Sequence, residues 1–138
     1  MSGQYINLRK KILMKNLIPT RIPVIIFALI FIFFGIGHFM NADKMAGYVP
    51  SMFPSPKVFV YISGAGFLLA GIAFIINRFA KLAGYLLALL LLIFVCTIHI
   101  PGMMHAADEG SKSMFMTNAL KDAGLAMAAI IIANISRQ

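Results

Sequence analysis

Charged residues are scarce in this chain, and acidic residues are the scarcest. Only 12% of the 138 residues are charged, and four acidic residues stand against twelve lysines and arginines, which gives a formal net charge of +8. The hydrophobic fraction is 61% and the mean hydropathy is +0.91, far above the values of soluble domains. This composition excludes an ordinary soluble domain and indicates an integral membrane protein in a lipid bilayer.

Cysteine and catalytic motifs are also missing. The single cysteine, Cys96, excludes an internal disulfide, and we interpret it as buried apolar filler one turn below His99. The chain has no Walker loop, glycine-rich dinucleotide fingerprint or nucleophile elbow. It also lacks C-x-x-C-H and H-E-x-x-H spacings, so we expect neither metal nor haem. The catalytic residues stay unknown, and whether the protein is an enzyme stays open.

Long hydrophobic runs dominate the sequence. Four of them, at about 22–39, 58–76, 82–100 and 114–135, approach the roughly 20 residues that a helix needs to cross a bilayer. None shows the alternation of a barrel strand, and lipid admits only helices or closed barrels. We therefore predict an all-α integral membrane protein with a single domain, residues 1–138, folded as an up-down bundle of four transmembrane helices.

The basic residues are distributed as topology signals. They gather in residues 1–21, in the turn after residue 76 and at the C-terminus, whereas loops 40–57 and 101–113 have little cationic excess. Because cytoplasmic segments carry the excess of lysine and arginine, we expect a multi-pass protein of the plasma membrane with both termini cytoplasmic. No basic patch interleaved with aromatic residues points to a nucleic-acid partner.

Polar residues within the spans gather at one depth, near the outer surface. They are His38, Tyr61, His99, Asn118, Lys121 and Asp122. Ionisable residues inside a membrane span mark functional sites by default, so we predict a ligand-binding cluster. Neighbouring residues on a helix diverge by about 100°, so Lys121 is expected to point away from Asp122, whose partner would be His38 or His99. The alternative is a structural polar clamp among the four helices.

Two further patterns concern packing. Gly66 with Ala70, and Gly124 with Ala128, are pairs of small residues that predict close helix approach. Loop 40–57 contains three prolines and many apolar residues, which predicts a short helical turn after Asn41 and then an extended segment. This loop would lie at the membrane interface as an anchor, or would cover the polar cluster as a lid.

The order of several motifs resembles the DoxX family over about residues 21–135. The motifs are "FFGIGHFM" with His38, "VYISGAG" with Tyr61, the end of the third run at His99, and "ALKDAGLAMA" with Lys121 and Asp122. The resemblance implies a four-helix bacterial membrane protein associated with quinone-linked redox complexes, although distant relatives resemble assembly chaperones. Many members carry a glutamate where this chain has Phe67, so any role of that carboxylate would be missing here.

These observations lead to three hypotheses of function. The first is an accessory subunit of a quinone-linked redox system, at most part of an oxidoreductase, whose polar cluster binds a lipophilic ligand such as a quinone. The second is a membrane assembly factor that binds the transmembrane helices of a client protein. The third is a small transporter that works as a homodimer.

Overall fold

The computed structural model describes residues 2–13 and 18–137, and every regular element within them is a helix. The elements are α1 (Ser2–Leu13), α2 (Arg21–Met40), α3 (Ala42–Ala46), α4 (Pro56–Ile76), α5 (Ala80–Phe94), the π-helix η1 (Val95–His99), α6 (Ile100–Met104) and α7 (Glu109–Ile135). Lys15, which we place in the basic N-terminal segment, lies outside the described residues. The all-helical prediction is confirmed.

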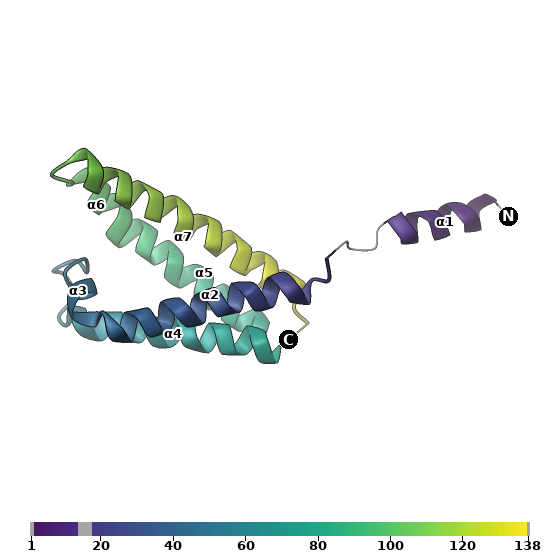
Figure 1. The fold of residues 1–138 in the computed structure, drawn as a ribbon, viewed down its shortest axis with the longest axis horizontal. Helices are drawn as coiled ribbons and strands as arrows, with labels where there is room; N and C mark the ends of the chain where they lie inside the picture. Colours follow the sequence, from purple (N-terminus) through teal and green to yellow (C-terminus); the bar gives the residue numbers. More distant parts are fainter. Residues whose placement is uncertain (1, 14–17, 138) are drawn as a thin grey trace.

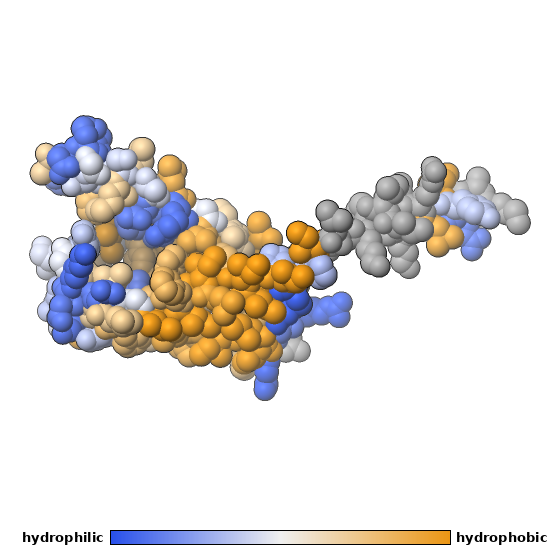
Figure 2. Space-filling model, viewed as in Figure 1, coloured by the Kyte–Doolittle hydropathy of each residue, from blue (hydrophilic) through white to orange (hydrophobic). Residues whose placement is uncertain are grey.

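Four helical segments are long and apolar enough to cross a membrane. They are Arg21–Met40, Pro56–Ile76, Ala80–Met104 and Glu109–Ile135. Large apolar side chains such as Phe33, Leu69 and Leu120 point outward and are exposed. Figure 2 shows a broad hydrophobic surface over the helices, with hydrophilic residues at both ends of the bundle. Such a surface suits contact with lipid tails rather than with water.

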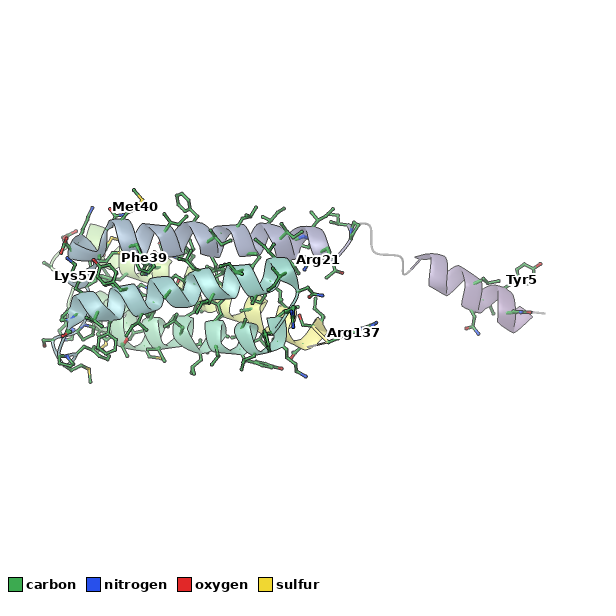
Figure 3. All side chains as sticks on the ribbon, turned by 90° about the horizontal axis from the view of Figure 1, so that it is seen from below. Tyr5, Arg21, Phe39, Met40, Lys57 and Arg137 are labelled. Carbon is green, nitrogen blue, oxygen red and sulfur yellow. The ribbon has the colours of Figure 1, made fainter. Side chains whose placement is uncertain are left out.

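The helices are arranged as two closely packed pairs. Helix α2 packs along α4, α5 packs along α7, and the pairs meet mainly through α4 and α5. Figure 1 shows the pairs diverging toward the end of the molecule where α3 and α6 lie. At the opposite end, Arg21 and Arg137 lie close to one another along the bundle axis (Figure 3). The separation of the two pairs at one end leaves room for the cavity described below.

The core fills the space between the pairs with aromatic and small residues. Phe31 and Phe74 are fully buried, and Phe31 lies 4.9 Å from Phe27 and 5.3 Å from Phe67 between ring centroids. On the other pair, Leu91 of α5 is fully buried and belongs to the same core cluster as small residues of α7 such as Ala126. Aromatic pairs at these separations add to the stability that burial of their area provides.

Glycines set the distance within each pair, but not all of the predicted ones do so. A Cβ at Gly35 would lie 2.8 Å from the Gly64 carbonyl oxygen, and one at Gly84 would lie 2.7 Å from the Ala129 carbonyl oxygen. Gly124, in contrast, has no neighbouring atom within 4 Å of an added Cβ. The predicted packing role of Gly124 is therefore wrong, because the face of α7 that meets α5 carries Ala129 instead.

The turn between α4 and α5 is tight, and a residue at the start of α2 hydrogen-bonds to the end of α4. Asn77 and Phe79 both adopt left-handed backbone conformations, with φ of 54° and 56°. Asparagine often adopts this conformation, whereas a bulky aromatic residue such as Phe79 rarely does. The Arg21 guanidinium donates to the carbonyl oxygens of Phe74 and Ile75 at 2.8 and 2.6 Å, so it satisfies two free acceptors at the end of α4.

Candidate functional site

A cavity of about 610 Å³ lies between the two helix pairs at the end where they diverge. Figure 2 shows a hollow at this end of the molecule. Apolar side chains from α2, α4 and α5 form most of its wall, among them Phe34, Phe67, Leu90 and Phe94. Five of the six residues that we predict as a ligand site also line it: His38, His99, Asn118, Lys121 and Asp122.

Loop 40–57 contributes one wall of this cavity. Met45, Tyr48, Val49, Pro50 and Phe53 from this loop line it. The Tyr48 ring meets the Phe115 ring of α7 edge-on at 6.3 Å, so the loop reaches across to the other helix pair. The loop therefore forms part of the wall around the polar cluster, and the choice between a lid and an interfacial anchor stays a prediction.

The short helix α3 is tied to the start of α4. Asp43 and Lys57 form an exposed ion pair at 2.7 Å between these two elements. Exposed ion pairs contribute little to stability, so this pair positions the loop more than it strengthens the fold.

His99 and Asp122 form the central polar contact. The His99 Nε2–H donates to Oδ2 of Asp122 over 2.8 Å, and Asp122 is only 5% exposed. Asp122 therefore has the compensating partner that we predicted for it. The Nδ1 atom of His99 is buried and has no partner among the described residues.

The position of His99 depends on an irregular stretch of helix. Residues Val95–His99 form a π-helix between α5 and α6, and Thr97 donates to the Ile93 carbonyl oxygen at 2.7 Å. π-Helical turns occur mostly as single bulges, frequently at functional sites. Cys96 belongs to this stretch and is exposed. Our interpretation of Cys96 as buried filler is therefore wrong.

Lys121 differs from our prediction as well. Its Nζ lies 3.4 Å from Oδ1 of Asp122 and 3.3 Å from Oδ1 of Asn118. The two neighbouring side chains do leave the helix in different directions, but the flexible lysine stem bends the ammonium back toward the carboxylate. The ammonium also lies 5.3 Å from the centroid of the Phe34 ring on α2, so Lys121 bridges the two helix pairs.

His38 occupies the opposite wall and does not pair with Asp122. Its Nδ1 lies 2.8 Å from the backbone carbonyl oxygen of Phe34, one turn earlier in α2. Because a carbonyl can only accept, Nδ1 carries the proton. The His38 ring meets the Phe67 ring edge-on at 5.0 Å. Gly64 permits this placement, since a Cβ there would lie 2.8 Å from Cβ of His38.

Two other polar aromatic residues lie away from the cavity. Tyr61, which we predict as a site residue, is absent from the lining and stacks on Phe39 at 5.5 Å instead. His105 lies on the exposed turn after α6 and donates through Nδ1 to the Pro101 carbonyl oxygen at 2.8 Å. Within residues 2–13 and 18–137, no three histidine, cysteine, aspartate or glutamate side chains cluster as they would around a metal ion.

Sequence reasoning missed Phe34 as a site residue. It holds His38 through its carbonyl oxygen and faces Lys121 with its ring. The spacing carried a signal, because residues four apart share one helix face and place Phe34 directly beneath His38. The contact with Lys121, however, depends on the distance between the two helix pairs at this end of the molecule, which no local pattern specifies.

The cavity therefore combines one pair of opposite charges with neutral hydrogen-bonding groups. The Lys121 ammonium and the Asp122 carboxylate balance one another, and the two histidines add ring nitrogens within an otherwise apolar wall. Pockets for small molecules share this design, in which a few polar groups orient a ligand inside a mostly hydrophobic surface.

Comparison with known protein families assigns the chain to a family. The family model described as Domain of unknown function (DUF8561) matches residues 27–137, a range that includes every polar residue of the cavity. Neither curated proteins nor solved structures gave a match. Because the match covers most of the chain, the protein belongs to the DUF8561 family.

Proposed function

We propose that this protein is a multi-pass membrane protein that binds a lipophilic, quinone-like molecule in the cavity between its two helix pairs. The observation that carries the proposal is that His38, His99, Asn118, Lys121 and Asp122 share a largely aromatic and aliphatic cavity of about 610 Å³. Cavities of roughly 300–1,000 Å³ are typical of small-molecule sites. A flat ring would pack against Phe34 and Phe67, while Lys121 and the histidines would meet its oxygen atoms.

The setting that we propose is a bacterial inner membrane. The four span-length helices would form an up-down bundle, with both termini in the cytoplasm and with loop 40–57 on the outer surface. Arg21, Arg78, Lys81 and Arg137 would then lie on the cytoplasmic side. The cavity would open near the outer leaflet, within reach of molecules dissolved in the bilayer.

The resemblance to DoxX proteins supports a role in redox chemistry as an accessory subunit. The motifs that carry it place His38, His99, Lys121 and Asp122 around one cavity. The sequence contains no recognisable binding motif for a redox cofactor. The protein would therefore hold or deliver a quinone for a partner protein in the membrane.

The first test is to purify the protein in mild detergent and to analyse what it retains. We expect the absorption spectrum and the solvent extract to contain a quinone, and added ubiquinone or menaquinone to raise the melting temperature, with a stabilisation that grows as the logarithm of its concentration over Kd. A protein without extractable quinone that also shows no melting shift with either compound would contradict the proposal.

One observation favours a second function, namely the binding of a client helix during assembly. The Lys121 side chain is 45% exposed although it belongs to a span-length helix. An exposed ammonium at membrane depth can pair with a polar residue of another transmembrane helix. Co-purification of one membrane protein in stoichiometric amount, with no quinone in the extract, would favour this function over ligand binding.

A further inference from the structure

The hydrogen-bonding state of His38 restricts which head group the cavity can accept. Its Nδ1–H donates to the Phe34 carbonyl oxygen, so the other ring nitrogen, Nε2, is a bare acceptor when the ring is neutral. Nε2 has no hydrogen-bond partner among the described residues, and His38 lines the cavity. The cavity thus contains an acceptor that only a ligand donor or water can satisfy.

The apolar rings and the ammonium group around His38 favour the neutral form of its imidazole. Its ring packs edge-on against Phe67, which is 3% exposed, and the neighbouring Phe34 ring already carries the Lys121 ammonium at 5.3 Å. A second cation in this apolar wall would be poorly solvated and would lie near a like charge. The carboxylate that could compensate it, Asp122, already accepts from His99 and faces Lys121.

Besides the amide N–H groups of Asn118, whose oxygen accepts from Lys121, the cavity has a free donor on Lys121. Its ammonium has three hydrogens, and the contacts with Asn118 and Asp122 account for two of them. A ligand oxygen can accept the third. The cavity therefore suits a head group that accepts a hydrogen bond from Lys121 and donates one to His38.

We propose that the cavity selects ligands whose ring carries a hydroxyl group, so that it binds the hydroquinone or phenol form in preference to the quinone or ether form. This inference rests on the proposed function and adds the chemical class of the ligand. A quinone has acceptors only, so it would satisfy Lys121 but would leave the Nε2 atom of His38 without a partner. A hydroxyl group satisfies both.

A pair of probes that differ in one hydrogen-bond donor tests this without redox chemistry. We would measure the affinity of 4-nonylphenol and of its methyl ether for the full-length protein in detergent, and then of short-chain ubiquinone and its hydroquinone under anaerobic conditions. Loss of one hydrogen bond to an unpaired acceptor in a mostly apolar cavity corresponds to about tenfold in affinity, so we expect the phenol and the hydroquinone to bind about tenfold more tightly than their partners.

Variants assign the preference to His38. His38→Phe keeps a ring in place but removes the acceptor, so it should bring the phenol and the ether to similar affinities. His105→Phe is the matched control, because His105 makes the same bond to a carbonyl four residues earlier but lies outside the cavity. It should keep the tenfold preference.

The outcomes separate the two proposals. Equal affinity of the parent protein for phenol and ether would overturn the hydroxyl selection and leave the cavity as a binding site. Failure of all four probes to bind would overturn the proposed function itself. If His38→Phe does not fold, the affinities of the four probes for the parent protein and for His105→Phe still test the inference. A preference for the ether or the quinone in these two proteins would contradict it.

Discussion

The Nε2–H of His99 donates to Oδ2 of Asp122 over 2.8 Å, and this single contact joins the π-helix to α7 at the wall of the cavity. The other carboxylate oxygen faces Lys121 at 3.4 Å. Asp122 thus holds two donors from different elements, and its removal should affect both.

We predict that Asp122→Ala lowers the stability of the protein, because it leaves the His99 Nε2–H buried without a partner. Orphaned buried donors cost about 1–3 kcal/mol. Asp122→Asn, which keeps an acceptor for His99, should cost less. Thermal unfolding in detergent measures both variants, and equal stability of Asp122→Ala and the parent protein would show that the contact is not a stabilising one.

A pair of glycine substitutions tests the packing of α5 against α7. Gly84→Ala should destabilise the protein by about 1–3 kcal/mol, because the new Cβ would lie 2.7 Å from the Ala129 carbonyl oxygen. Gly124→Ala has open space around its Cβ and should be neutral or stabilising by up to about 1 kcal/mol, since alanine favours a helix. The same unfolding assay compares the two, and a reversed order would refute the observed helix interface.

The start of α7 should respond to acid. Asp108 accepts from the Ser111 N–H at 2.8 Å and from its hydroxyl at 2.7 Å, and these bonds lower the pKa of the Asp108 carboxyl. A lowered pKa stabilises the folded state above the ordinary aspartate pKa, and this contribution is lost as the pH falls through the folded value. The difference in melting temperature between the parent protein and Asp108→Ala should therefore be largest near neutral pH and should shrink below about pH 4. A difference that grows on acidification would contradict the cap.

The orientation in the membrane can be tested at Glu109. Its side chain is 91% exposed, and a cysteine there leaves the Asp108–Ser111 bonds intact. In a Cys96→Ser background, which removes an exposed native thiol, Glu109→Cys should react with a membrane-impermeant thiol reagent in intact cells. Reaction only after lysis would place the turn before α7, and with it the cavity, on the cytoplasmic side.

Hydrophobic runs predicted the four span-length helices well, because their length and composition are local properties. The last helix begins at Glu109 rather than near residue 114, since Asp108 caps a turn that composition alone does not mark as helical. The π-helix at Val95–His99 was not predictable either, because a run of apolar residues looks the same in both kinds of helix.

The sequence predicted which residues belong to the polar site better than it predicted the contacts that they make. Depth along each helix brought His38, His99, Asn118, Lys121 and Asp122 into one group, and all five line the cavity. Depth says nothing of direction around the helix axis, which explains why Tyr61 lies outside the lining. The bend of the Lys121 stem toward Asp122 follows from side-chain flexibility, which ideal helix geometry does not describe.

The most direct measurement is photolabelling of the full-length protein in lipid vesicles with a diazirine-bearing quinone in both oxidation states. We predict label on the cavity residues Phe34, Phe67 and Asp122 that excess unlabelled quinone or hydroquinone removes. The near neighbours Phe33, Leu69 and Leu120 face outward and provide the internal control, since their label should not be competed. Label confined to these outward residues, or label on the cavity that excess ligand does not remove, would contradict the account of the cavity as a ligand site.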